Sequence, residues 1–560
     1  MKRNYFIVFS IILVLLLAAC TSDEPTSEAT NNDVEVDEEK VSQIQDGTYK
    51  FDSPVTITSI HALVNQEYRN GETYDDNVHT RWAHDELGID IDYLFSAPYD
   101  QATTRIRLML SSGEKMPDVL HTVTNELIKD LIESGQYRDI SEDFERYASP
   151  KLKAAYSHEP EQWLQFAHDG GRYGIPIFKP MGNDSSLMWI RQDWLDELGL
   201  DAPETLDELE HVLNEFKEKK PGGTDNIIPL GLSLGSNRPL VNWYGESSPI
   251  FGMFDTIPSI WHVTDDGTLE HGSIRPGMKD GLALLADWYE KGYMHREAGL
   301  HDEGRVMELV TEGRVGVVFA PAWTGIHQIP QIAENLGDEN ATMKPHRIPE
   351  NNGIRGGEDT GYHFGGIMVH RDFEHIDALF LYINRLFEAH DPEPGSEFEH
   401  GYGYEGYDYV ILEDGTVSRE VEDFEEDPVK TEGYGMTNNT TLMDPFREAE
   451  LLSKLASGEE PETPGEKIAA AKCIDLCIEP TSLINEHISD YISTAHVGAP
   501  TPTQTSQRDV LNSMEFEMVL NIIYGRAPLD SYDRFVEQWF NAGGEQITKE
   551  VNEAYSARQE

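Results

Sequence analysis

Two motifs, each defined by the spacing of its glycines, contain residues that could take part in catalysis or cofactor binding. Gly231-Leu-Ser-Leu-Gly235 matches G-x-S-x-G, in which a serine on a strand-to-helix turn acts as a nucleophile. A strand-like run precedes it, but Asn237-Arg-Pro239 favours a loop where a helix would have to begin. Gly401–Gly406 fits G-x-G-x-x-G without the strand and helix that a dinucleotide site needs. We therefore expect no catalytic residue and no enzyme.

Metal-binding and redox motifs are also missing from the sequence. It contains no H-E-x-x-H, no Walker loop and no four-ligand Cys/His set. Cys473 and Cys477 lie four residues apart on one predicted helix face, which leaves both two buried thiols and a disulfide open. Because the chain has 102 acidic residues, a pair of carboxylates in the sequence does not by itself indicate an acid/base catalytic site. The sequence predicts no cofactor and no metal.

The composition of the whole chain limits the class of protein to which it can belong. The 560 residues include 43 Lys and Arg against 102 Asp and Glu, a formal charge of −59. Such a charge repels phosphates, so no nucleic acid is expected as a partner. Hydrophobic residues make up 39% of the chain, which is enough for a sizeable core, and three cysteines in this length exclude a disulfide scaffold.

The first residues are typical of an export signal. Lys2 and Arg3 precede an apolar run, 5–19, that is too short to span a bilayer. The run ends in Leu17-Ala-Ala-Cys20, which resembles the bacterial lipobox, and the resemblance implies cleavage after residue 19 and lipidation of Cys20. An ordinary secretory signal with a chance cysteine is the alternative. Residues 20–52 are acidic and poor in large apolar side chains, so they are predicted to form a disordered tether.

The body of the chain alternates predicted strands and helices. Strand-like runs at 55–64, 89–94 and 116–120 are separated by helical patterns, which indicates a sheet with helices on its faces. Thr205 and Glu208 form a capping box before an apolar stripe that ends near Pro221. Further elements are predicted as a hairpin at 413–416 and helices at 513–524, 531–541 and 548–556.

Several blocks in register resemble one family, the lipoprotein solute-binding proteins of bacterial ABC importers. Within extracellular solute-binding family 1, the blocks resemble the large-oligosaccharide (LplA/alginate-binding-like) branch. The most distinctive block combines Tyr-Gly-Ile-Pro at 173–176 with Trp-Ile-Arg-Gln-Asp-Trp-Leu at 189–195. Other matching blocks, in the family's order, are 82–89, 112–119, 201–208, 401–407, 522–525, 539–544 and 550–553.

The resemblance implies an α/β, two-lobe periplasmic-binding-protein-like (type II) fold, with a hinge and an interlobe ligand cleft. The chain is expected to cross between lobes near Tyr173 and near 345–365. The predicted segments are a signal peptide at 1–19, the tether at 20–52, the first lobe at 53–172 and 346–395, the second lobe at 173–345, and a mostly helical part at 396–560 that completes the second lobe and hinge.

A sugar ligand would need aromatic rings for its C–H faces and polar groups for its hydroxyls. The family places such residues on loops at strand ends that face the cleft. The candidates here are Asn65, Glu67, Tyr68, His121, Asn125, Lys179, Asn183, Asp184, Trp243, Trp261, Trp323 and Tyr362. Trp189 and Trp194, which lie inside the family's structural block, are predicted to be core residues.

One block departs from the family's pattern. Members often carry an acidic, calcium-loop-like segment after the capped helix, but the matching residues 220–229 retain only Asp225 and Asn226 as side-chain oxygen donors. Calcium needs six to eight oxygens, mostly from closely spaced carboxylates. We therefore do not expect calcium to bind at this loop.

The sequence thus predicts a monomeric extracellular binding protein, held on the outer face of the cell membrane by its lipid. It would capture an oligosaccharide and deliver it to ABC transporter permease subunits. The alternatives are a lipid-anchored polysaccharide-degrading enzyme and a peptide-binding importer component. Binding without turnover distinguishes the first function from the enzyme.

The lipobox generates the first prediction. Cys20→Ser removes the thiol that would be acylated, so the variant should appear in the medium or as an unprocessed precursor, with its body folded. Fractionation and immunoblotting measure this, with wild type as the control. Recovery of the variant in the membrane fraction at wild-type size would exclude a lipid anchor on Cys20.

Overall fold

A computed structural model describes residues 37–62, 67–122, 125–158, 160–179, 182, 184–223, 226–235, 240, 243–359, 361, 363–436, 443–472, 475–498 and 500–559. The chain divides into two units, Met1–Glu39 and Lys40–Glu560. The account below concerns the second unit. Cys20, Asn65, Asn183 and Tyr362, as well as Cys473, lie outside the described residues.

The first lobe is built on a three-stranded sheet in the order β3 (Val119–Thr122), β14 (His363–Val369), β6 (Ile175–Phe178). The middle strand, β14, is antiparallel to both neighbours. A parallel pair, β1 (Val55–His61) and β2 (Ile89–Ser96), lies beside it, with Ile57 opposite Ile91. Thr58 of β1 donates to Asp118 through its amide and its hydroxyl, at 2.9 and 2.6 Å, which ties the pair to the start of β3.

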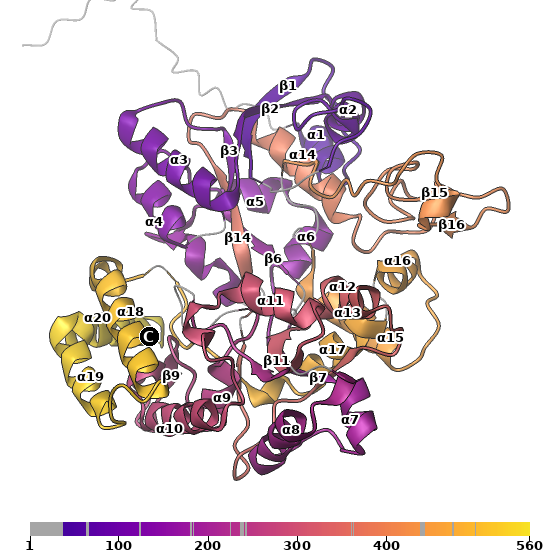
Figure 1. Ribbon diagram of the computed structural model, residues 1–560. Helices are drawn as coiled ribbons and strands as arrows, with labels where there is room; N and C mark the ends of the chain where they lie inside the picture. The colour runs from indigo at the N-terminus through magenta and orange to yellow at the C-terminus, as the bar shows by residue number, and fades with distance from the viewer. Residues whose placement is uncertain are drawn as a thin grey trace, which may run out of the picture. The chain divides into compact units, whose positions relative to one another are not determined.

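Helices surround the strands of this lobe (Figure 1). Leu379, Phe380 and Ile383 of α14 are fully buried and pack with Ile57 and Ile175. The other helices and short strands of this part are α2 (Val78–Trp82), α3 (Tyr99–Ser112), α4 (Asn125–Glu133), α5 (Ser141–Tyr147), α6 (Pro150–Ala155), α14 (Ile376–Phe387), β4 (Ala167–His168) and β5 (Gly171–Arg172).

The second lobe is built on a four-stranded sheet in the order β12 (Met343–His346), β7 (Ser186–Arg191), β11 (Val315–Pro321), β8 (Ile228–Gly231). The central strand β11 is antiparallel to β7 and parallel to β8. Trp189 is fully buried and Trp194 is 1% exposed, which confirms both as core residues.

The capped helix predicted after Thr205 is α8 (Leu206–Lys219). The Thr205 hydroxyl accepts from the amide of Glu208, and the Glu208 carboxylate accepts from the amide of Thr205, so the predicted capping box is present. Leu209, Val212, Leu213 and Phe216 are buried. The remaining elements of the region are α7 (Gln192–Leu198), α9 (Ser248–Gly252), α10 (Pro276–Lys291), α11 (Glu303–Thr311), α12 (Thr324–His327), α13 (Ile329–Leu336), β9 (Trp261–Val263) and β10 (Leu269–His271).

Three C-terminal helices share the core of the second lobe: α18 (Pro502–Ile523), α19 (Ser531–Trp539) and α20 (Glu545–Gln559). They lie next to α10 in Figure 1, and Val519, Trp539 and Val551 are buried with Trp288. All three were expected. Helix α18 begins earlier than predicted because Thr501 and Gln504 form a second capping box, with Pro502 at the first helical position. None of the helices in the described part is long and apolar enough to cross a bilayer.

The chain passes from the first sheet to the second between Phe178 and Ser186. This is one strand later than the crossing expected near Tyr173, because β6 pairs with β14. The return lies between His346 of β12 and His363 of β14, within the expected 345–365. There β13 (Gly357–Asp359) pairs in parallel with β17 (Tyr491–Ser493).

The polar stretch after α14 packs on the first lobe, although the sequence assigns it to the part that completes the second. Phe398 and Met436 are buried in the first-lobe core, and Tyr402 packs against it. The predicted hairpin is present as β15 (Val410–Ile411) and β16 (Val417–Ser418). Helices α15 (Pro445–Ala456), α16 (Pro464–Lys472) and α17 (Asp475–Glu486) follow.

The prediction that the acidic tether extends to Asp52 is wrong. Helix α1 (Glu38–Gln45) lies inside that range, and Val41, Ile44 and Phe51 are buried. Val41 and Ile44 are three residues apart, so they share one helix face. That apolar face packs on the first-lobe core and offsets the cost of ordering an otherwise polar segment.

Asn384 of α14 connects three backbone segments of the first lobe. Its amide group donates to the carbonyls of Ile44 and Tyr147, at 3.0 and 2.8 Å, and its oxygen accepts from the amide of Ser149 at 2.9 Å. The side chain is 2% exposed. Its loss would leave three backbone groups without partners.

This contact generates the second prediction. Asn384→Ala should lower the free energy of unfolding by about 3 kcal/mol or more, because each buried group left unpaired costs about 1–3 kcal/mol. Urea denaturation followed by circular dichroism measures the change. Asn541→Ala is the matched control, since that side chain makes one exposed hydrogen bond, to the Glu537 carbonyl. Equal stability of the two variants would contradict this role for Asn384.

Candidate functional site

Trp323 lies two residues beyond the end of β11, where the chain leaves the second sheet. Its ring is half-buried, and its indole Nε1 donates to Oδ1 of Asp184 at 2.9 Å. The other oxygen of Asp184 lies 2.5 Å from Nζ of Lys179. Lys179 and Asp184 both belong to the connection between β6 and β7, so the end of β11 is joined to the crossing between lobes.

Two more rings surround Trp323 and form with it an aromatic cluster of Trp243, Tyr244 and Trp323. The Tyr244 ring meets Trp323 edge-on at 5.1 Å between centroids, and the Trp243 ring does so at 6.1 Å. Trp243 is 48% exposed, which is unusual for a ring of this size. Burial raises the pKa of Tyr244, so its phenol stays protonated and can donate a hydrogen bond at neutral pH.

Several polar side-chain atoms near this cluster are buried without hydrogen-bond partners in the described structure. Ser185 follows Asp184 directly, and Thr324 and Gln328 belong to the segment that begins just after Trp323; each has one such oxygen. Asn485 of α17 has no partner for either amide atom, and its oxygen would lie 3.3 Å from a Cβ at Gly182 on the same crossing. Because buried polar atoms are normally paired, these are groups that the hydroxyls of a ligand could satisfy.

A second aromatic group lies on the first lobe, after the end of β1. The Tyr68 ring stacks on Tyr434 with centroids 4.8 Å apart, and its hydroxyl lies 3.2 Å from Nε2 of His61. The Tyr434 hydroxyl donates to the carbonyl of Glu67 at 2.9 Å. Burial raises the pKa of Tyr68 to about 12, so the phenol is neutral under physiological conditions.

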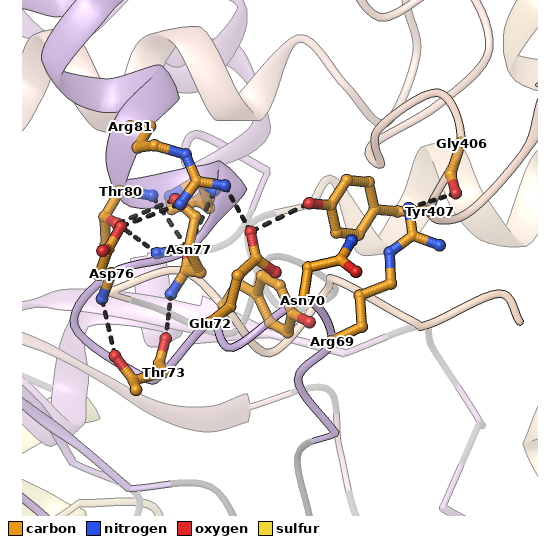
Figure 2. A network of polar contacts seen from close by, with 12 residues as sticks. Arg69, Asn70, Glu72, Thr73, Asp76, Asn77, Thr80, Arg81, Gly406 and Tyr407 are labelled. Atoms are coloured by element: carbon orange, nitrogen blue, oxygen red, sulfur yellow. Dashed lines mark hydrogen bonds and ion pairs between the residues drawn. The ribbon is translucent and has the colours of Figure 1, made fainter. Parts of the chain in front are cut away.

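Figure 2 shows the polar network that supports this loop. The Arg69 guanidinium lies over the ring of Tyr407, 3.7 Å from its centroid, and donates to the carbonyl of Gly406. The Tyr407 hydroxyl donates to Glu72 at 3.0 Å, and Glu72 is also paired with Arg81 of α2. The loop after β1 is therefore fastened to the 404–434 segment, more than 300 residues away in sequence.

His327 of α12 lies beside the aromatic cluster, with its ring 5.8 Å from that of Trp323. Burial lowers the pKa of His327, and the positive charge of Lys430 lowers it further, while Glu432 opposes this. Lys430 and Glu432 shortly precede Tyr434 in the chain.

The structure thus brings four of the predicted residues together, Lys179, Asp184, Trp243 and Trp323, and places Glu67 and Tyr68 in the second group. His121 is buried on β3 opposite Ile367, and Asn125 begins α4. Trp261 is 4% exposed and lies in the hydrophobic core, with its ring against His271. It offers no ring face to a ligand here, so we leave it out of the site.

Sequence reasoning missed Tyr434, Thr324, Gln328 and Asn485. Thr324 and Gln328 could have been found from their proximity to Trp323 in the chain. Tyr434 lies in a block of tyrosines and glycines that gives no indication of which ring faces Tyr68. Asn485 has no local signal, because only the packing of α17 against the crossing places it there.

Neither the serine motif nor a cavity elsewhere in the second lobe competes as a site. Ser233 is fully buried, and its hydroxyl donates to the carbonyl of Tyr244 at 2.6 Å, so it is not presented as a nucleophile. A cavity of about 720 Å³ lies elsewhere in the second lobe, between β12, α15 and α17. Its described lining residues include His346, Arg355 and Glu479, and none of them is a Trp, Tyr or Phe, the rings that stack on a sugar.

Comparison with known proteins places the chain among binding proteins. Residues 65–362 match the family described as bacterial extracellular solute-binding protein. The fructooligosaccharide ABC transporter substrate-binding protein FusA of Streptococcus pneumoniae is 27% identical over 246 residues, 42% of this chain and 44% of that protein. The match therefore spans less than half the length of that relative.

Two further likenesses extend over most of the chain. The polygalacturonan/rhamnogalacturonan-binding protein YtcQ of Bacillus subtilis is 22% identical over 470 residues, 80% of this chain and 82% of that protein. A crystal structure of the alginate-binding protein AlgQ2, without calcium ion, covers 91% of this chain and 99% of its own with a TM-score of 0.61 and 18% identity. This structural likeness supports the two-lobe fold of the present chain. Because the family match covers more than half of the sequence, this chain belongs to the bacterial extracellular solute-binding proteins.

Proposed function

We propose that this protein captures an oligosaccharide outside the cell and delivers it unchanged to the permease of an ABC importer. The observation that carries the proposal is the cluster of Trp243, Tyr244 and Trp323 around the paired side chains of Lys179 and Asp184. Rings of this kind cover the C–H faces of sugars, and charged or amide groups bind the hydroxyls. The sugar-binding relatives support the same ligand class.

The two aromatic groups suggest how the ligand is held. Trp323 follows β11 of the second lobe and packs with Tyr244, while Tyr68 follows β1 of the first lobe and stacks on Tyr434. In our proposal a sugar chain binds between them, and closure about the segments at 178–186 and 346–363 buries it. Asn485, Ser185, Thr324 and Gln328 would then bind hydroxyl groups.

The proposed location and partners complete this function. Lipidation of Cys20 would hold the protein on the extracytoplasmic face of the membrane, since two acyl chains anchor where one binds only marginally. The chain would act there as a monomer beside its permease subunits. The formal charge of −59 keeps such a surface soluble and makes self-association unfavourable.

The third prediction concerns Trp323. Trp323→Ala should weaken oligosaccharide binding at least about thirtyfold, because a central, desolvated ring contact contributes about 2 kcal/mol or more. The melting temperature should fall only slightly, since the ring is half-buried. Calorimetry and thermal melting measure the two effects. Trp261→Phe, which keeps an aromatic ring in the core, is the control and should retain affinity. Unchanged affinity in Trp323→Ala would exclude Trp323 as the platform.

The fourth prediction separates binding from catalysis. Wild-type protein titrated with a panel of neutral and acidic oligosaccharides should bind at least one of them and return it intact after prolonged incubation. Calorimetry gives the affinity, and chromatography of the released sugar gives its length. Shortened sugars, produced by wild type and not by a heat-denatured sample, would show an enzyme instead.

A further inference from the structure

Three potential metal ligands lie together in the loop between α10 and α11. One ligand atom from each of His295, Glu297 and His301 lies within 4.8 Å of the others. The two imidazole rings are 4.5 Å apart between centroids. This spacing, His-x-Glu-x-x-x-His, is not a standard zinc motif, and the sequence by itself does not indicate a site.

The backbone of this loop is held in place by the surrounding fold. The amide of Leu234 donates to the carbonyl of Ala298 at 3.2 Å, and the amide of Gly235 donates to the carbonyl of His301 at 2.9 Å. The amide of Gly299 donates to the hydroxyl of Tyr524, in the C-terminal helical part, at 2.6 Å. The three side chains are thus presented from a turn with a fixed conformation.

The chemical types of the three side chains suit a metal. A neutral imidazole offers a free electron pair on one ring nitrogen, and a carboxylate offers two oxygens. The positive charge of Arg305, four residues after His301, is compensated by Glu308 at 2.7 Å. The Glu297 carboxylate is exposed and can turn toward the rings.

His301 is the most enclosed of the three residues. It is only 8% exposed, and its ring lies against that of His295, with 4.5 Å between the centroids. Nδ1 of His295 accepts from the amide of Glu297 at 3.1 Å. That amide would compete with a metal for Nδ1, which favours moderate affinity and reversible binding.

We propose that His295, Glu297 and His301 bind a divalent ion of the zinc class, with water completing its coordination. Two imidazole nitrogens and one carboxylate oxygen form the ligand set that zinc accepts when it keeps an open position. Calcium and magnesium prefer oxygen ligands only and would not compete. The ion would cross-link the two ends of the α10–α11 loop.

The test uses the full-length, untagged protein in detergent, stripped with EDTA and dialysed. Zinc chloride should bind with a stoichiometry of one per chain by calorimetry and raise the melting temperature by a few degrees, because a ligand of the folded state stabilises it. Calcium and magnesium chloride should do neither. Failure of wild type to bind one zinc would overturn the proposal.

Matched variants locate the ion. Glu297→Gln changes an exposed side chain and should fold normally, while zinc affinity falls about tenfold or more as one of three ligands is lost. His295→Ala should abolish the stoichiometric binding. His84→Ala is the control, since that exposed histidine pairs with Asp90 and should leave zinc binding unchanged. Full zinc binding by His295→Ala, or its loss in His84→Ala, would place the ion elsewhere.

Discussion

The carboxylate of Asp184 receives the ammonium of Lys179 on one oxygen and the indole of Trp323 on the other. Its side chain is 10% exposed, so its charge is largely removed from water, and the Lys179 ammonium balances it while the indole adds a neutral hydrogen bond. The connection between lobes supplies the acid and the lysine, and the end of β11 supplies the ring. The position of the ring and the path of the crossing therefore depend on a single charged contact.

The first-lobe side of the proposed site depends on a loop that is held in place by contacts with distant residues. Tyr68 follows β1 and would have many orientations if the loop were held only at its ends, which would cost entropy on binding. The stacking on Tyr434 and the contact of Arg69 with Tyr407 remove that freedom before any ligand arrives. The long polar stretch after α14 thus supports the first-lobe half of the site. From composition alone, the acidic residues of this stretch predict a solvent-exposed loop.

Side-chain chemistry separates the two proposed sites. Around Trp323 the unpaired atoms belong to serine, threonine and amide side chains, which exchange readily between water and the hydroxyl groups of a sugar. In the α10–α11 loop the grouped side chains are two imidazoles and a carboxylate, which are ligands that a metal ion of the zinc class accepts. The chemical type of the atoms, rather than their burial, distinguishes the two sites.

The local elements followed from the sequence because their causes are local. The capping box at Thr205 and Glu208, the stripe of α8, the burial of Trp189 and Trp194 and the C-terminal helices depend on neighbours within a few residues. The blocks near Tyr173 and Trp194 were also sufficient to identify the family and its two-lobe fold. The tether boundary was misjudged because two apolar residues, Val41 and Ile44, outweighed an acidic composition.

Only the tertiary structure decided which side chains meet. Trp323 and Trp261 are both tryptophans beside strands, yet one lies half-buried beside Asp184 and the other is enclosed in the core. Asn485 reaches the crossing, and Tyr434 reaches Tyr68, from positions hundreds of residues away. Composition and periodicity describe the face that a residue presents within its own element. They carry no information on which distant element packs against that face, because this depends on how all the elements fill the shared core.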